Sequence, residues 1–213
     1  MPQKPGKYGI LFRVLADAKA RYVYRMLPYT GQTDEAEDAE SGKPKDLVMK
    51  LIAGLEGSGR NVTMDRYYTS VDLVEELCAT HKLTVVGTIK SNSKGLPEEV
   101  KEAGGREEQS SVFAWNDKVM LVSYVPQKRK NVLMLSTMHD TPEVEGDRNK
   151  PIVIQFYNKT KGGVDTVDQM IDMYGAKVGT RRWSMVVFYT IIDISALNGL
   201  LVWKETHPQP PPG

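Results

Sequence analysis

Three aspartates stand where a strand is expected to end or a helix to begin: Asp17, Asp65 and Asp165. Carboxylates at such termini can converge on one edge of a sheet, where their oxygens are the hard ligands that Mg²⁺ prefers. Two such ions, roughly 3.5–4 Å apart, would stabilise the attacking and the leaving oxygen of a phosphodiester displacement. A single aspartate at such a position is more often a turn or capping residue, so the spacing alone is weak evidence.

The elements that must position these acids follow an α/β pattern. Apolar and aromatic runs predict a β-hairpin before and after Asp17, and a short strand ends at Asp65. Leu47, Val48, Leu51, Ile52 and Leu55 predict a helix that starts near Pro44. The predicted hairpin strands are residues 7–16 and 21–29, the strand before Asp65 is 61–64, the next helix is 70–80, and the most strongly indicated buried strand is 83–89.

The residue pattern of the sequence changes after Lys90, where polar segments alternate with short β-like runs. We therefore expect a β-rich insertion over residues 91–157, with its last strand at 152–157. A helix carrying Asp165, Asp168 and Asp172 follows Lys161-Gly162-Gly163. The expected organisation is a first core segment over 1–90, the insertion over 91–157, a helical completion of the core over 158–205, and a proline-rich tail over 206–213.

The composition is that of an ordinary globular chain with a real core. Of 213 residues, 40% are hydrophobic and 26% are charged, and the formal net charge is +1. This balance excludes a strongly basic protein that binds nucleic acid through its net charge alone. Five of the acids lie in one segment, residues 34–40. One cysteine, Cys78, excludes a disulfide framework and, with three scattered histidines, a structural zinc site. The N-terminus lacks the apolar run of a signal peptide, so we expect an intracellular protein.

The sequence segments around the acids resemble those of piggyBac-type transposases. The matching segments occur in the same order as in the family, from about Lys7 to Trp203. The resemblance rests on several uncommon sequence motifs and not on one short pattern. The match to the family's first-aspartate hairpin, Leu15-Ala16-Asp17, is the least strong. The other matching segments are NVTMDRYYTS (61–70) and LTVVGTIKSN (83–92) for the second aspartate, YNKTKGGVDTVDQM (157–170) for the third, and Arg181-Arg182-Trp183 with the helix after it.

The resemblance implies a ribonuclease H-like α/β fold, a mixed sheet flanked by helices, with a β-rich insertion between the second and third catalytic aspartates. It makes Asp17, Asp65 and Asp165 the metal-binding catalytic triad. Asp168 is an accessory catalytic acid on the same helical face as Asp165. The implied cofactor is Mg²⁺, with two ions bound and Mn²⁺ as a substitute.

The same resemblance implies nicking of double-stranded DNA at transposon ends, attack of the freed 3′-hydroxyl, and joining at TTAA targets. We expect a nuclear protein that acts as a homodimer. The sequence holds no counterpart of the family's N-terminal DNA-engaging region or its cysteine-rich zinc domain, and this predicts an isolated catalytic core.

Five residues are candidates for DNA contact. Arg66 departs from the family, which commonly has Asn directly after the second aspartate. Its side chain can bind a DNA phosphate or compete with a metal ion, and we favour the first. A tryptophan beside cations can stack on an unpaired base. The full expected set is Arg66, Lys161, Arg181, Arg182 and Trp183.

The helix expected over 183–203 has 15 apolar residues in 21. Its length alone permits a membrane span. Asp193 and Asn198 inside it argue against a span, because a mid-membrane aspartate is costly. We therefore expect a core helix packed on the sheet and no membrane partner.

Three functions remain open from the sequence. The first is the catalytic core of a DDD transposase, which the retained acids favour. The second is a transposon-derived protein without catalysis that serves as a DNA-binding or scaffold module. The third is a stand-alone ribonuclease H-like nuclease, which a preference for RNA–DNA hybrids over DNA would distinguish.

Overall fold

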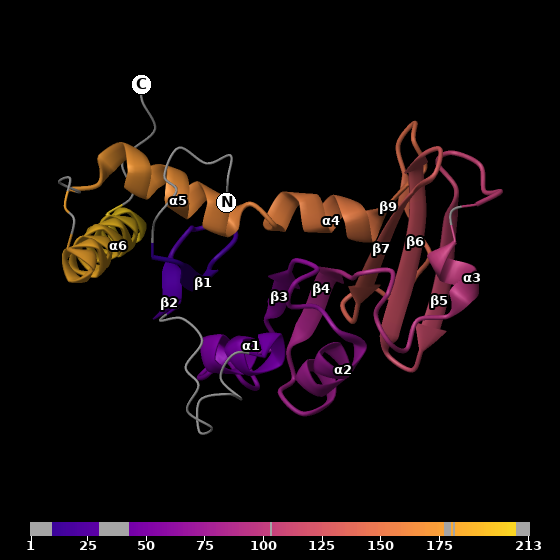
Figure 1. Cartoon of the computed structure of the whole chain (residues 1–213), viewed down its shortest axis with the longest axis horizontal. Coiled ribbons are helices and arrows are strands. Elements are labelled where there is room, and N and C mark those ends of the chain that lie inside the picture. Colours follow the sequence, from indigo (N-terminus) through magenta and orange to yellow (C-terminus); the bar gives the residue numbers. More distant parts are fainter. Residues whose placement is uncertain (1–9, 30–42, 103, 177–179, 181, 208–213) are drawn as a thin grey trace. The chain divides into compact units, whose positions relative to one another are not determined.

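The computed structural model describes residues 10–29, 43–102, 104–176, 180 and 182–207 (Figure 1). The chain divides into two compact units. The first unit comprises Met1–Gly42 and Gly162–Gly213, and the second comprises Lys43–Lys161. Asp17, Asp165 and Asp168 therefore belong to the first unit, and Asp65 belongs to the second.

The second unit is built on a mixed five-stranded sheet of order β3-β4-β7-β6-β5. β3 and β4 are parallel, and every other neighbouring pair is antiparallel. A parallel pair needs a crossover connection, and α2 lies between these two strands in the sequence. The bounds are β3 Asn61–Met64, α2 Val71–Ala79, β4 Thr84–Thr88, β5 Ser111–Asn116, β6 Val119–Gln127 and β7 Lys130–Ser136.

Helix α2 forms for the reasons that its sequence indicates. Leu73, Val74 and Leu77 recur at helical spacing, and none of these side chains is exposed. The N-cap residue is Ser70, whose hydroxyl accepts a hydrogen bond from the Leu73 N–H at 3.3 Å. The neighbouring Thr69 is not the cap, and its hydroxyl donates to the Asp65 carbonyl in the preceding turn.

The β-rich segment after Lys90 extends the sheet that contains β3 and β4. β7 pairs directly with β4, with Val86 opposite Ser136 and Gly87 opposite Leu135. Figure 1 shows β5, β6 and β7 side by side. The expected insertion is thus continuous with the core sheet. The domain limits at residues 90, 157 and 205 stay a prediction, and the end of the tail, 208–213, lies outside the described residues.

The strand expected over 152–157 was wrong, because this segment begins helix α4, Ile152–Thr160. Its apolar residues do not alternate. Val153, Ile154 and Tyr157 follow helical spacing and pack on the cluster formed by Val86, Met120, Val122, Tyr124 and Met134. The preceding loop pairs only as a short ribbon of β8, Val144–Glu145, and β9, Lys150–Pro151. The other helices of this unit are α1, Pro44–Ile52, and α3, Glu98–Lys101.

The described residues of the first unit form a β-hairpin and two helices. β1, Phe12–Ala16, pairs antiparallel with β2, Val23–Pro28, which confirms the expected hairpin. The helices are α5, Gly163–Tyr174, and α6, Trp183–Thr206. Their shared core is formed by Val23, Val167, Ile194 and Leu197, with Val14, Ala16 and Met26 packed against it.

Candidate functional site

Asp17 lies in the tight turn that follows β1. Its Oδ1 accepts hydrogen bonds from the backbone N–H groups of Lys19 at 2.8 Å and Ala20 at 2.5 Å. Its own backbone N–H donates to the Tyr22 carbonyl at 2.8 Å. One carboxylate oxygen therefore shapes the turn, as in an Asx turn, while the side chain as a whole is exposed.

Asp65 stands at the end of β3 in a second, independent turn. Its Oδ1 accepts from the Tyr67 N–H at 2.9 Å. Its carbonyl accepts from the Thr69 hydroxyl at 2.8 Å. The side chain is exposed, so the backbone of this aspartate is fixed and its carboxylate remains accessible.

Gly87 in β4 makes this turn possible. A Cβ at this position would lie 2.5 Å from the Thr69 Oγ1 and 3.1 Å from the Met64 carbonyl oxygen. Any side chain here would displace the threonine that holds the Asp65 backbone. From the sequence, Gly87 was expected only within the buried strand 83–89, with no further role.

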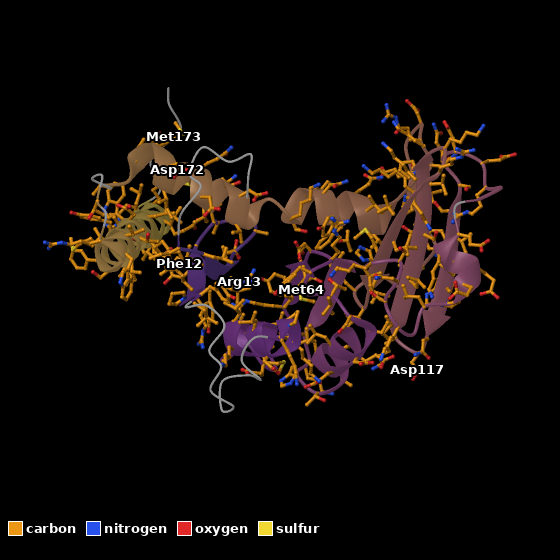
Figure 2. All side chains as sticks on the ribbon, viewed as in Figure 1. Phe12, Arg13, Met64, Asp117, Asp172 and Met173 are labelled. Carbon is orange, nitrogen blue, oxygen red and sulfur yellow. The ribbon has the colours of Figure 1, made fainter. Side chains whose placement is uncertain are left out.

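Asp165 and Asp168 occupy the start of α5 and are both exposed. They are one helical turn apart, so they share a face as expected. Asp165 lies in the first turn, where a negative charge is stabilised by the helix dipole. Further along α5, Asp172 is also exposed, and Figure 2 labels it next to Met173 near the end of the helix.

Gly163 brings the start of α5 against the turn of Asp17. The residue is buried, and a Cβ on it would lie 3.2 Å from the Ala18 Cα and 3.6 Å from the Asp17 carbonyl oxygen. Only glycine allows two backbones to approach so closely without a shift. Within the first unit, the structure thus places the segments of Asp17 and Asp165 in contact. The Gly162-Gly163 pair was the available signal in the sequence.

Two polar residues of α6 fix the rest of this unit. Asp193 Oδ1 accepts from the Ala176 N–H at 2.8 Å, just after α5 ends. Asn198 donates to the Val23 carbonyl and accepts from the Val23 N–H, both at 2.9 Å. In the sequence these two residues argued only against a membrane span, and their part in anchoring α5 and β2 was not foreseen.

Helix α6 is long and apolar enough to cross a membrane by length and composition. It packs on the hairpin and on α5 through Ile194 and Leu197. One face of α6 therefore packs in the core as expected. Large apolar side chains on its other faces are exposed, with Trp183 at 73% and Phe188 at 52%.

The residues expected to contact DNA are spread over both units. Arg66 and Lys161 are exposed in the second unit, and the Lys161 Nζ lies 5.8 Å from the Tyr157 ring centroid. Arg182 is the exposed N-cap residue of α6, directly before Trp183. Arg181 lies outside the described residues. Their role in DNA binding stays a prediction.

The donor chemistry of the three aspartates fits a hard divalent cation. Each carboxylate is exposed, and in Asp17 and Asp65 the hydrogen bonds to the turn engage only Oδ1. Mg²⁺ commonly takes one or two carboxylates and keeps several waters. Among the residues that the structure describes, however, no three His, Cys, Asp or Glu side chains are grouped closely enough to hold a metal ion.

The comparisons with known proteins identify the family. The profile of the transposase IS4 family matches residues 1–200, so the chain belongs to that family. Its resemblance to the piggyBac type is confirmed by a solved structure, the piggyBac transposase synaptic complex with hairpin DNA. The two chains are 33% identical, with a TM-score of 0.87 over 96% of this chain and 43% of that one.

A curated human relative points the same way. The piggyBac transposable element-derived protein 3 is 25% identical over 197 residues, which cover 84% of this chain and 33% of the relative. The chain thus spans about a third of this relative. The structural match confirms the ribonuclease H-like α/β fold expected from the sequence. Transposases of the DDE/DDD type generally use divalent metal ions.

Proposed function

We propose that this chain carries the catalytic core of a piggyBac-type transposase, which nicks double-stranded DNA at transposon ends and joins the freed strand at TTAA sites. Family membership and the 33% identity to a transposase solved with DNA support the proposal. The observation that carries it is the close approach at Gly163, because it holds the segments of two of the three aspartates together.

In this proposal Asp17, Asp65 and Asp165 hold two Mg²⁺ ions, for which Mn²⁺ can substitute, and Asp168 is the accessory acid. When bound, the ions supply Lewis-acid stabilisation of the charge that develops on the phosphate oxygens. The Asx turns at Asp17 and Asp65 keep one oxygen of each carboxylate turned toward the backbone. The turns thereby limit the rotamers of these side chains and prepare the other oxygen for binding.

The DNA would be engaged by exposed cations and by Trp183, which can stack on an unpaired base. Transposition at paired ends also implies a homodimer and a nuclear location, and both belong to the proposal.

A plasmid-nicking assay tests the proposal. Supercoiled DNA is incubated with the chain and Mn²⁺, and the nicked circle is measured on a gel. Asp165→Asn should abolish nicking, whereas Asp172→Asn, which removes the same charge from the same helix, should retain it. Equal nicking by wild type and Asp165→Asn would remove Asp165 from the chemistry.

The alternative is a transposase-derived protein without catalysis that serves as a DNA-binding or scaffold module. Under this alternative, the chain binds DNA in a mobility-shift assay, but neither Mg²⁺ nor Mn²⁺ supports nicking.

A further inference from the structure

Polar side chains occupy one face of β3, the edge strand that ends just before Asp65. On the other face, Val62 and Met64 are 7% and 6% exposed and belong to the apolar core. Asn61 and Thr63 alternate with them along the strand, so they lie on the opposite face, and both are half-buried. Polar groups that are partly withdrawn from water need hydrogen-bond partners within the protein.

These side chains form one series of hydrogen bonds that runs from β4 to the end of α4. The Thr84 hydroxyl donates to the Asn61 Oδ1, and the Asn61 amide donates to the Thr63 Oγ1, both at 3.2 Å. The Thr63 hydroxyl donates to the Thr160 Oγ1 at 2.9 Å, and the Thr160 hydroxyl donates to the Phe156 carbonyl at 3.0 Å. Each of the three middle groups accepts from one neighbour and donates to the next, and hydrogen bonds in such a series strengthen one another.

Apolar packing and the threonine contact hold opposite ends of α4. Val153 and Ile154, in the first turn, are 2% and 6% exposed and pack in the core. Asn158 and Lys159, near the end, are exposed. There the Thr160 hydroxyl reaches the side chain of Thr63 on β3. Loss of either hydroxyl would therefore release the last turn of α4 from this strand.

The two threonines stand next to segments that carry candidate metal ligands. Thr63 lies two positions before Asp65 in the sequence. Thr160 is the last residue of α4, and only two residues separate it from the start of α5, the helix that carries Asp165. Little chain is therefore left between Thr160 and α5 to absorb a displacement of the end of α4.

We propose that Thr63 and Thr160 are positioning residues for the candidate metal site. Their contact ties the strand that ends at Asp65 to the end of the helix from which the chain continues to Asp165. Neither hydroxyl touches a metal ion in this proposal, and the pair acts by holding the segments that carry the carboxylates. Outer contacts of this kind commonly orient metal ligands. The inference rests on the proposed function, because it takes these aspartates as ligands of Mg²⁺ or Mn²⁺.

A double-mutant cycle tests the contact itself, in the full chain and in EDTA. Thr63→Val and Thr160→Val each keep the branched shape of the side chain and remove the hydroxyl. Each single variant should lower the melting temperature. The double variant should lose less than the sum of the two losses, because both single changes break the same hydrogen bond. Losses that add would show that the two residues are not coupled and would overturn the proposal.

The dependence on Mn²⁺ tests the positioning role. Plasmid nicking is measured over a series of Mn²⁺ concentrations, and the rise in melting temperature on adding Mn²⁺ without DNA gives a second readout that needs no turnover. Each valine variant should raise the Mn²⁺ concentration for half-maximal nicking by about tenfold and should reduce the rise in melting temperature. Thr63→Ser, which keeps the hydroxyl, should restore both wild-type values.

Thr190→Val is the matched control. Thr190 is half-buried in α6, and its hydroxyl donates to the Val186 carbonyl of its own helix at 2.8 Å, as the Thr160 hydroxyl does to the Phe156 carbonyl. This variant removes the same kind of hydroxyl from a helix at a distance in sequence from both segments. It should keep the wild-type Mn²⁺ dependence in both measurements.

The outcomes separate this inference from its premise. Valine variants that melt earlier in EDTA but keep the wild-type Mn²⁺ dependence would make the contact purely structural, and the proposed function would stand without it. Wild type that neither nicks DNA nor gains stability from Mn²⁺ would contradict the proposed function and the inference together. If Thr63→Val does not fold, Thr160→Val removes the same contact from the helix and decides the question alone.

Discussion

Glycine and asparagine hold the candidate aspartates of the first unit in place, although neither residue carries chemistry of its own. Gly163 allows α5 to touch the Asp17 turn. The Asn198 side chain hydrogen-bonds both the backbone N–H and the backbone carbonyl of Val23, as a neighbouring strand would do. The placement of the Asp17 and Asp165 segments within this unit therefore rests on contacts of residues that have no catalytic side chain.

We predict that Gly163→Ala lowers the free energy of unfolding of the first unit by about 1–3 kcal/mol, because the added Cβ meets the backbone of Ala18. Gly199→Ala in α6 is the control, since nothing lies within 4 Å of its Cβ position. There the better helix propensity of alanine should stabilise by about 0.5–1 kcal/mol. Thermal melting followed by circular dichroism measures both. Two shifts of the same sign would refute the close-approach argument.

We predict that Asn198→Ala costs about 2–3 kcal/mol, because it leaves both backbone groups of a buried residue, Val23, without a partner. Ser195→Ala on the same helix removes only a hydroxyl bonded to the Ile191 carbonyl of its own helix. That variant should change stability by less than about 0.5 kcal/mol. Denaturant unfolding compares the two, and similar losses would show that Asn198 contributes no more than an ordinary exposed position.

Among the elements, the end of β7 contains a pH-sensitive contact. The Ser136 hydroxyl oxygen accepts from the N–H groups of Met138 and His139, so its proton is directed to the His139 Nδ1 at 2.8 Å. Burial, including an edge contact with Phe156 of α4, lowers the pKa of His139 below 6.5, against the opposing effect of Asp140 and Glu143. The folded state therefore prefers neutral histidine.

The unfolded chain binds a proton at His139 more readily than the folded chain, so stability is lost as the pH falls from about 6.5 through the lowered pKa. We predict that His139→Gln reduces this loss between pH 7 and 5. The melting temperature of wild type and variant over that range measures the difference. Parallel curves would show that His139 does not contribute.

Elements with a single clear periodicity could be predicted from the sequence. The 61–64 strand and α2 agree with expectation because burial on one side fixes their pattern. The segment 152–157 was assigned to the wrong class, since β-branched residues favour a strand while its packing against Val86 and Met134 requires helical spacing. Local preference gave way to tertiary packing there.

For the whole molecule, the sequence segments around the aspartates indicated the family, and the comparisons confirm it. What the sequence does not contain is the contact that each turn makes with a distant segment. Thr69 against Gly87 and Gly163 against Ala18 are such contacts. They join residues far apart in sequence whose types, taken singly, are ordinary.

The most direct test of the metal-dependent core is a crystal of the chain with DNA, soaked in Mn²⁺ and measured at the manganese edge. We expect anomalous density bound by Asp17, Asp65 and Asp165 together, and we expect Asp65→Asn to lose it. DNA bound in the crystal with no manganese at these three carboxylates would contradict it and leave a DNA-binding module without catalysis.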